Sequence, residues 1–406
     1  MGSDGSTGPI AKETRPPAVL QVVPSLVSGG VERGTVELAG ALTAAGWTAY
    51  VASAGGPMER QLSRVGAQHI RLPLASKNPL VIRRNAKALI EIVRRCRIDV
   101  IHARSRAPAW SAWSAARATR RRFVTTFHNA YPDNLPLKRW YNSVMARGER
   151  VIAISQFVGD HAAEVYGIGS DCLRVIPRGV DLNQFDPDRV AGERVVKLAE
   201  QLRVPDDAAV VMLPGRLTRW KGGLEFIEAI ACLGRRDLCC LFVGTEQRRG
   251  FRRELEAAIK RFGLIGMFRI LDDCRDMPAA YQLADLVVSA STDPEGFGRV
   301  IVEAQAMGRP VIATDHGGAR ETIVPGVTGW LVSPRDPAAL SAAIGEALAL
   351  DPAARAAFAR RCRAHVAANY SRELMCARTI EVYEELLFPE PEQTCLEPAI
   401  PIAAHA

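Results

Sequence analysis

Short apolar runs rich in β-branched residues alternate with amphipathic segments from about residue 18 to residue 388 of this chain. The runs are VLQVV (19–23), AYVAS (49–53), IRLPL (70–74), DVIHA (99–103), FVTTF (123–127), VIAIS (151–155), LRVIP (173–177), VVMLP (210–214), CCLFVG (239–244), FRIL (268–271), LVVSAS (286–291), PVIAT (310–314) and WLVS (330–333). Near-continuous apolar strands separated by helices are typical of parallel sheets that helices cover on both faces. The pattern runs through two sets, so the sequence predicts two doubly wound, Rossmann-like α/β domains.

Polar and Pro-rich stretches mark the boundaries of these domains. A polar segment separates the two sets of runs, and Ser371 is placed as the N-cap of a last amphipathic helix. Both ends of the chain lack the pattern and are polar or Pro-rich, which favours disorder. The expected units are a tail at 1–17, a first domain at 18–185, a hinge at 186–207, a second domain at 208–370, a helix crossing back to the first domain at 371–388, and a tail at 389–406.

The composition excludes several classes of protein. Hydrophobic residues make up 48% of the 406 residues, which is ample material for two cores. No run of 18 apolar residues occurs, and residues 1–17 lack the apolar stretch of a secretory signal. The nine cysteines form no C-x-x-C pair, which favours buried thiols in a reducing compartment. We therefore expect a cytoplasmic protein.

The charge is unevenly distributed along the chain. Residues 1–180 carry 25 Lys and Arg against 12 Asp and Glu, whereas the remainder carries 27 against 32. The densest basic stretch, 81–122, suits a nucleic acid, a membrane surface or an anionic acceptor, unless it is simply a solvated helix face. Nucleic acid is disfavoured because only Trp110 and Trp113 are interleaved with these cations for base stacking.

Residues that suit phosphate follow the first strand of each predicted domain. Gly29 and Gly30 precede a helix, whose N-terminal amides suit a phosphate, although the same pair also fits a simple tight turn. The turn is not G-x-G-x-x-G, which disfavours a nicotinamide dinucleotide site. In the second domain, Arg216 and Lys221 offer two cations for a diphosphate, the alternative being two surface cations at a strand end.

Two carboxylates eight residues apart form the most informative local element. Glu295 lies on a Gly-bounded loop, and Glu303 lies about one turn inside the following helix. Amides at 296–299 lie at the helix start and can donate to phosphate or sugar oxygens. The alternative is a helix-start acid followed by an ordinary exposed glutamate. That alternative is weakened because an unpartnered acid on an apolar helix face is costly.

Together these elements resemble the retaining glycosyltransferases of the GT-B fold known as GT4, or glycosyltransferase group 1. The resemblance covers residues 18 to 388 and includes GGVER (29–33), RVIPRGVDLNQF (174–185), GRLTRWKG (215–222), the Glu295/Glu303 element and GGARETI (317–323). One departure is Arg178, where the family often has Asn. This adds a cation near the cleft that could select an acidic acceptor.

The resemblance implies a role for each matching residue in a cleft between two facing domains. Arg216 and Lys221 would bind the donor diphosphate, Glu303 the ribose and Glu295 the donor sugar. His128, at the end of FVTTF, would lie near the reacting carbon, unless it is only a hydrogen-bonding histidine at a strand end. The other residues expected to contact the donor are Gly29, Gly30, Gly244, Glu246, Gly296, Phe297 and Gly298, with the turn 272–276 holding the base.

The resemblance also implies the cofactor, partners and reaction. No metal is expected, because the only D-x-D, at Asp186 and Asp188, fits a proline-constrained turn. The donor would be a UDP- or GDP-linked sugar and the acceptor a lipid-linked or envelope glycan, lipopolysaccharide being the leading candidate, with front-face attack retaining the configuration. A nucleotide-sugar epimerase of the same fold is the alternative. The cations expected to meet an anionic membrane, on its inner face, or the acceptor are Arg117, Arg120, Arg121 and Arg122.

Overall fold

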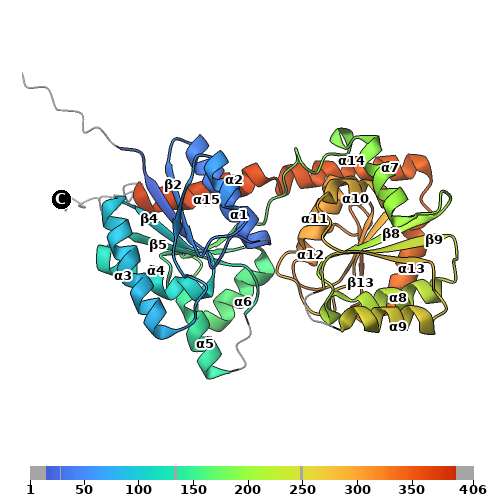
Figure 1. Cartoon of the computed structure of the whole chain (residues 1–406), viewed down its shortest axis with the longest axis horizontal. Helices are drawn as coiled ribbons and strands as arrows, with labels where there is room; N and C mark the ends of the chain where they lie inside the picture. The colour runs from blue at the N-terminus through green and yellow to red at the C-terminus, as the bar shows by residue number, and fades with distance from the viewer. Residues whose placement is uncertain (1–14, 28, 132–134, 247–249, 390–406) are drawn as a thin grey trace, which may run out of the picture.

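The computed structural model describes residues 15–27, 29–131, 135–246 and 250–389. The chain forms two α/β domains that lie side by side and are joined near the middle of the chain and by the C-terminal helices (Figure 1). Each domain is a parallel sheet covered by helices, which confirms the fold class predicted from the alternating runs.

The first domain has a seven-stranded sheet with the order β3-β2-β1-β4-β5-β6-β7. Its strands are β1 (Ala18–Val22), β2 (Thr48–Ser53), β3 (Gln68–Arg71), β4 (Val100–Ala103), β5 (Arg122–Phe127), β6 (Arg150–Ala153) and β7 (Leu173–Val175). The helices that follow them are α1 (Gly30–Ala44), α2 (Glu59–Arg64), α3 (Pro79–Arg95), α4 (Arg106–Thr119), α5 (Pro136–Asn142) and α6 (Gln156–Tyr166). Every neighbouring pair of strands is parallel.

The second domain has a six-stranded parallel sheet with the order β10-β9-β8-β11-β12-β13. Its strands are β8 (Ala209–Pro214), β9 (Leu238–Val243), β10 (Phe268–Leu271), β11 (Leu286–Ser289), β12 (Val311–Thr314) and β13 (Trp330–Val332). Its helices are α7 (Gly192–Leu202), α8 (Gly223–Leu233), α9 (Phe251–Arg261), α10 (Met277–Leu283), α11 (Arg299–Ala306), α12 (Ala319–Thr322), α13 (Pro337–Leu348) and α14 (Pro352–Asn369). The strands of both sheets overlap the apolar runs of the sequence one by one.

The strand order reverses once in each sheet, between β1 and β4 in the first domain and between β8 and β11 in the second. In doubly wound sheets, ligands bind at such a reversal, beyond the carboxyl ends of the strands. The turns that follow β1, β8 and β11 are those that carry the Gly pair, the two cations and the Glu295 loop. The topology therefore brings the chemistry-bearing turns of each domain to a ligand-binding edge.

The segment 186–207, expected to be a hinge, is mostly folded. Helix α7 lies within it, and Arg194 on this helix binds Asp276 with an Nε–Oδ2 distance of 2.8 Å. Asp276 is the N-cap of α10, so α7 is fastened to the second domain. The apolar face of α7 was missed because its charged residues give the segment a polar composition.

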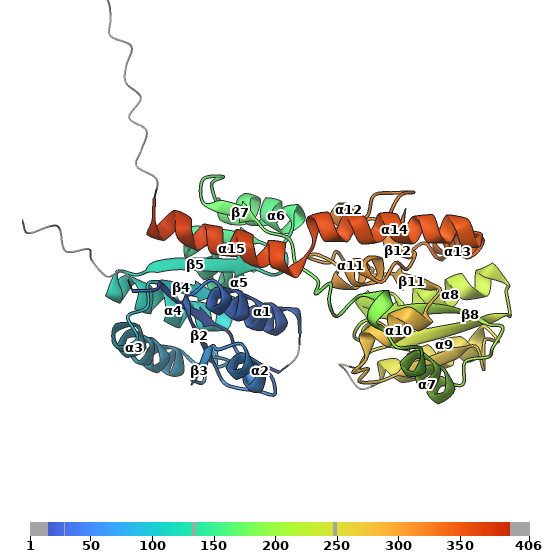
Figure 2. The ribbon, with the colours of Figure 1, turned by 90° about the horizontal axis from the view of Figure 1, so that it is seen from above.

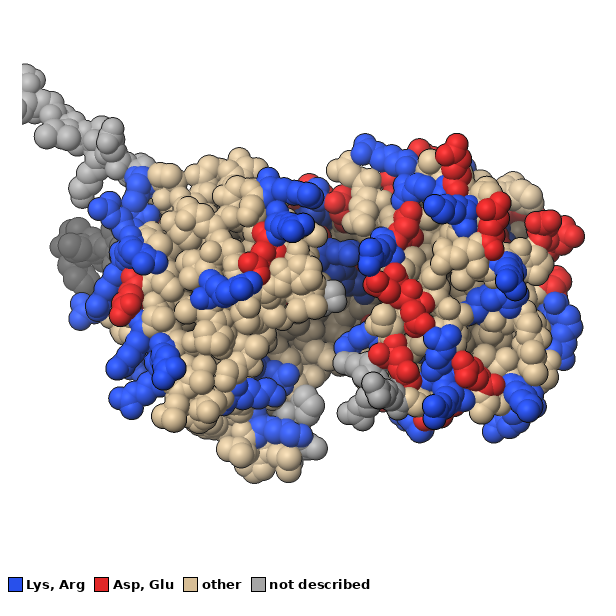
Figure 3. Space-filling view, in the orientation of Figure 1, with Lys and Arg blue, Asp and Glu red and all other residues tan. Residues whose placement is uncertain are grey.

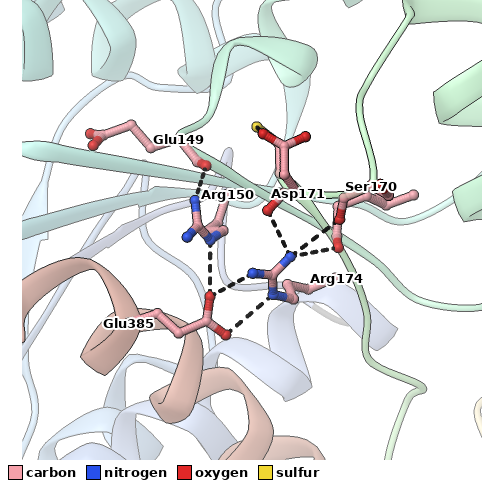
Figure 4. A network of polar contacts seen from close by, with 8 residues as sticks. Glu149, Arg150, Ser170, Asp171, Arg174 and Glu385 are labelled. Atoms are coloured by element: carbon pink, nitrogen blue, oxygen red, sulfur yellow. Dashed lines mark hydrogen bonds and ion pairs between the residues drawn. The ribbon is translucent and has the colours of Figure 1, made fainter. Parts of the chain in front are cut away.

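The C-terminal helix α15 (Arg372–Leu387) lies on the first domain after α14 has run along the second (Figure 2). Tyr383 on α15 is buried, and its hydroxyl lies 2.6 Å from Nδ1 of His102 on β4. Nearer the end of the helix, Glu385 binds Arg150 on β6 and Arg174 on β7, at 2.9 Å and 2.8 Å (Figure 4). Part of the positive charge of the first domain is therefore balanced by a carboxylate from the far end of the chain.

The predicted tails 1–17 and 389–406 lie almost entirely outside the described residues. Arg15 is described, and its guanidinium binds both carboxylate oxygens of Asp99 at 2.7 and 2.8 Å. Within the described part of the chain, no helix has both the length and the apolar character needed to cross a bilayer.

Candidate active site

The loop that carries Glu295 touches the first domain directly. A Cβ on Gly296 would lie 3.0 Å from the carbonyl oxygen of His128, which follows β5. On the same side, the hydroxyl of Ser155 donates a hydrogen bond to the carbonyl of Gly296. A larger residue at position 296 would crowd the first domain, so the two domains meet closely at the loop that was expected to hold the donor sugar.

Glu295 and Lys221 bind each other. The Nζ of Lys221 lies 2.6 Å from Oε1 of Glu295, and the Ser291 hydroxyl donates to the same oxygen. Both side chains are mostly buried, with 12% of Lys221 and 16% of Glu295 exposed. Burial acts to raise the pKa of Glu295, but the charge of Lys221 and the hydrogen bonds outweigh it and hold that pKa below its ordinary value. The sequence placed these two residues at one site but did not foresee their ion pair.

Glu303 is also matched with a cation. Its Oε2 accepts a hydrogen bond from the Tyr281 hydroxyl at 3.0 Å, and its Oε1 binds Nη2 of Arg299 at 3.1 Å. The stem of Arg299 extends to the first domain, because its Cδ would lie 3.3 Å from a Cβ on Gly30. Glu303 is thus a buried, partnered carboxylate next to the cleft and not an exposed helix residue.

Of the other polar residues expected to contact the donor, some have a protein partner and one does not. Arg216 is exposed and has no hydrogen-bond or ion-pair partner among the described residues, so its guanidinium is available for a ligand. Glu246 accepts a hydrogen bond from the amide of Arg252 at 3.0 Å and so stabilises the start of α9. In the turn 272–276, Asp272 binds Arg252 at 2.6 Å. The carboxylates near the expected base site therefore have local partners.

The glycines of the predicted site lie at helix starts and strand ends. Gly29 is the N-cap of α1 and Gly298 is the N-cap of α11. Gly244 follows β9, where a Cβ would lie 2.1 Å from the carbonyl oxygen of Gly215. Phe297 is buried, and its ring packs edge-to-face on Tyr370 with centroids 5.6 Å apart. Phe297 is therefore a packing residue that holds the loop in place.

A buried basic cluster lies beneath the start of α1 in the first domain. The Nη2 of Arg178 donates to the Gly30 carbonyl at 3.0 Å and lies 3.2 Å from Nδ1 of His128. Because a guanidinium only donates, Nδ1 of His128 accepts and its proton resides on Nε2. Burial together with the charges of Arg178 and Arg104 lowers the pKa of His128 well below its ordinary value, so the ring is neutral at neutral pH.

Arg104 and Arg178 lie close together in this cluster, and their proximity was not predicted from the sequence. A Cβ on Gly34 would lie 2.4 Å from Nη1 of Arg178 and 3.3 Å from Nη2 of Arg104. Burial and the neighbouring arginines lower the pKa of Arg178 to about 9. Arg178 is 6% exposed, so this cation lies near the cleft, as expected, but is buried beneath the start of α1. A glycine at position 34 of an amphipathic helix was the one available signal.

The basic stretch 81–122 does not form one face. Arg104 follows the carboxyl end of β4, whereas Arg120, Arg121 and Arg122 precede or open β5 and lie at the opposite edge of the same parallel sheet. Arg122 binds Glu149 at 2.7 Å, and Arg121 lies 3.7 Å from Asp99. The guanidinium of Arg117 lies over the Trp113 ring. The predicted basic face is therefore distant from the cleft edge and partly neutralised.

Lys and Arg side chains are visible in the hollow between the two domains, and charges of both signs cover the second domain (Figure 3). The D-x-D motif contributes nothing to this hollow, because Asp186 and Asp188 both bind Arg363 on α14 at 3.1 Å. Among the described residues, no group of three or more metal-ligating side chains is gathered at one place.

Comparisons with known proteins agree with this geometry. Residues 28–184 match the model of Glycosyltransferase Family 4, and residues 196–365 match that of Glycosyl transferases group 1. The crystal structure of a glycosyltransferase from Rickettsia africae is 39% identical, covers 93% of this chain and 100% of its own, and superposes with a TM-score of 0.86. Anabaena HepE in complex with UDP and glucose is 25% identical, with 90% and 99% coverage and a TM-score of 0.79.

Curated relatives point the same way. A D-inositol 3-phosphate glycosyltransferase from Xylanimonas cellulosilytica is 29% identical over 303 residues, which is 71% of this chain and 72% of the relative. One from Geodermatophilus obscurus is 35% identical over 217 residues, about half of either chain. The two matched family regions, one in each domain, together with the cleft geometry, show that this chain belongs to glycosyltransferase family 4 and is a glycosyltransferase of the GT-B fold.

Proposed function

We propose that this glycosyltransferase transfers a sugar from a nucleoside diphosphate sugar, with retention of configuration and without a metal ion, to a lipid-linked or envelope glycan. The observation that carries the proposal is the Lys221–Glu295 pair on turns that converge beside His128. HepE, at 25% identity, is known with UDP and with UDP-glucose, which favours a UDP-linked donor here. Lipopolysaccharide is the acceptor class that we propose from the sequence, whereas the curated relatives are D-inositol 3-phosphate glycosyltransferases.

The leaving diphosphate needs positive charge, which the second domain can supply without a metal. Arg216 has no partner within the part of the chain that the structure describes, Lys221 lies five residues further along the chain, and the amides that open α11 begin at Arg299. Such preorganised donors stabilise developing negative charge without any proton transfer. The departing phosphate would accept the proton of the attacking hydroxyl, since Glu295 and Glu303 are each already matched with a cation. Neither carboxylate is presented as a nucleophile, which favours front-face attack.

Three measurements test this activity. A thermal-shift screen against UDP, GDP and ADP identifies the base, because a ligand at 100 times its Kd adds about 2.7 kcal/mol to the free energy of unfolding. Incubation with nucleotide sugars but no acceptor separates slow hydrolysis, expected of a transferase, from the interconversion of an epimerase. Glu295→Gln should lower turnover about 10²–10³-fold while the fold persists. Near-native turnover of that variant with the true acceptor would refute the assignment.

For a lipid-linked acceptor, we propose that the first domain docks on an anionic membrane through α5, which projects from that domain in Figure 1. Leu137 is 76% exposed and Trp140 is 58% exposed. Lys138 and Arg139 lie between them, and residues 135–148 contain no Asp or Glu. An exposed apolar side chain and a Trp flanked by cations are typical of a helix that lies in a membrane interface.

This surface differs from the basic face predicted from the sequence, and flotation with liposomes distinguishes them. Leu137→Ser with Trp140→Ser should release the protein from vesicles rich in anionic lipid, whereas reversal of Arg120, Arg121 and Arg122 to Glu should not. Binding should weaken at high salt, because the Debye length contracts from about 10 Å at 0.1 M to about 3 Å at 1 M. Equal flotation of all variants would exclude α5 as the membrane contact.

A further inference from the structure

Glu321 connects the two domains in a way that the proposed roles do not use. It belongs to α12 in the second domain, yet its carboxylate reaches the start of α6 in the first. Its Oε2 accepts a hydrogen bond from the amide of Gln156 at 2.7 Å, and its Oε1 accepts one from the amide of Phe157 at 2.8 Å. One carboxylate therefore binds two successive backbone amides across the domain boundary.

These amides are ones that a helix cannot satisfy by itself. The first four N–H groups of an α-helix lack intrahelical partners, and a negative charge there is favourable. Within α6, Ser155 supplies one acceptor, because its hydroxyl oxygen accepts from the amide of Val158 at 3.1 Å. Glu321 supplies the acceptors for the two preceding amides. The start of α6 is thus completed by a residue of the other domain.

The turn that leads to Glu321 packs on the loop of the candidate active site. A Cβ on Gly317 would lie 2.5 Å from the carbonyl oxygen of Glu295, and one on Gly318 would lie 2.5 Å from Cα of Phe297. The amide of Gly318 also donates to the Glu295 carbonyl at 2.9 Å. Any shift of the Gly317–Glu321 segment is therefore transmitted to the Glu295 loop.

The other side of the same loop faces the first domain. Ser155, which caps α6, also donates to the Gly296 carbonyl, and Gly296 lies against His128. The Glu295 loop thus lies between the Gly317–Gly318 turn and the first domain. Glu321, which follows that turn, hydrogen-bonds to the first domain and so connects the two. Behind it, the Tyr370 hydroxyl fixes the backbone of Glu321, donating to its carbonyl at 2.6 Å.

We propose that Glu321 is a positioning residue that sets the two domains in register, so that the Glu295 loop lies against His128 during sugar transfer. The proposal rests on the proposed function of this cleft. Glu321 touches neither of the residues assigned to the donor diphosphate, Arg216 and Lys221. Its loss should therefore affect the geometry of transfer and not the binding of the nucleotide.

The test compares Glu321→Gln and Glu321→Ala with Glu346→Gln, which changes an exposed glutamate on α13 that has no partner among the described residues. Gln keeps one acceptor oxygen but turns an NH2 group toward the second amide, so it should be intermediate. A misplacement of about 1 Å can cost about 10²-fold in rate. We expect kcat to fall about 10-fold in Glu321→Gln and about 10²-fold in Glu321→Ala, with the Kd for UDP within twofold of the wild type.

Hydrogen exchange gives a readout that does not depend on turnover. The amides of Gln156 and Phe157 should exchange faster in Glu321→Ala, whereas the Glu346→Gln control should match the wild type. Unchanged exchange or unchanged kcat in Glu321→Ala would overturn the proposal. A parallel loss of UDP affinity, melting temperature and kcat would also overturn it, since the residue would then be merely structural. If the wild type transfers no sugar, the proposed function fails, while exchange still reports on the contact.

Discussion

Replacing Lys221 with Met should destabilise the second domain, because the Glu295 carboxylate then loses its cation in a place that water barely reaches. Removing one partner of a buried ion pair costs about 3–5 kcal/mol. The lower end applies here, since the Ser291 hydroxyl still donates to the same carboxylate oxygen. At about 2–4 °C per kcal/mol for a domain of this size, the Tm should fall by about 6–12 °C.

The loss should depend on pH in a defined direction. In the wild type, the pKa of Glu295 in the folded protein lies below its value in the unfolded chain. The ionised carboxylate therefore stabilises the fold at any pH above the unfolded pKa, and this stabilisation is lost as the pH falls through the folded pKa. Without Lys221, burial prevails and raises the folded pKa above the ordinary value. The loss of unfolding free energy in Lys221→Met is then greatest at high pH, and it becomes smaller as the Glu295 carboxyl takes up a proton. The difference between wild type and Lys221→Met should be largest at pH 8 and smallest near pH 4.

Scanning calorimetry at pH 8, 6 and 4 measures this loss of stability. A double-mutant cycle compares Lys221→Met, Glu295→Gln and the variant that carries both changes. The double variant has no buried charge at this position, so at pH 8 it should be more stable than Lys221→Met alone. A double variant as unstable as the single one, or a loss that is the same at every pH, would refute the reasoning.

Three further predictions concern the cleft and the basic cluster. Arg216→Ala should weaken UDP binding by about 1.5–3 kcal/mol and leave uridine binding unchanged, which calorimetric titration checks. The Tm should not change either, because the Arg216 guanidinium has no partner to lose among the described residues. Gly34→Ala should cost about 1–3 kcal/mol of stability by overpacking against Arg178. In an Arg178→Ala background the same change should instead stabilise by about 1 kcal/mol, as Ala does over Gly in a helix, which urea unfolding measures. Activity should survive EDTA, and rescue by Mg²⁺ after loss would reopen Asp186 and Asp188 as ligands.

The sheets could be predicted from the sequence because buried parallel strands are encoded locally. Each strand of this fold needs a short apolar run between turn residues, and such a run is visible without knowledge of its neighbours. The topology then follows from few rules, which is why the turns carrying Gly29, Arg216 and Glu295 could be assigned to a ligand-binding edge. The family resemblance added the roles, but the placement of these turns rests on the alternation alone.

The contacts between distant segments could not be predicted in this way. Glu303 and Arg299 are four residues apart on one helix, yet the stem of Arg299 meets Gly30 only because the domains are adjacent. The basic stretch 81–122 is dense in the sequence but passes from one edge of the sheet to the other, so linear density did not indicate a face. Glu321 belongs to the GGARETI turn singled out in the sequence, but its contacts could not be predicted there, since its partners are backbone amides in another domain.

The two carboxylates of the candidate site each balance one of its cations. Lys221, which we propose contacts the donor diphosphate, and Arg299 lie in a half-buried cleft, where unpaired cations would be costly. Each is matched with a carboxylate of its own domain, Glu295 and Glu303. In the proposed function, the donor phosphates would contact a cation of these pairs while the donor hydroxyl groups donate to the carboxylates. A diphosphate alone would meet only the cations, so we expect the paired arrangement to favour the complete sugar nucleotide over the nucleotide product.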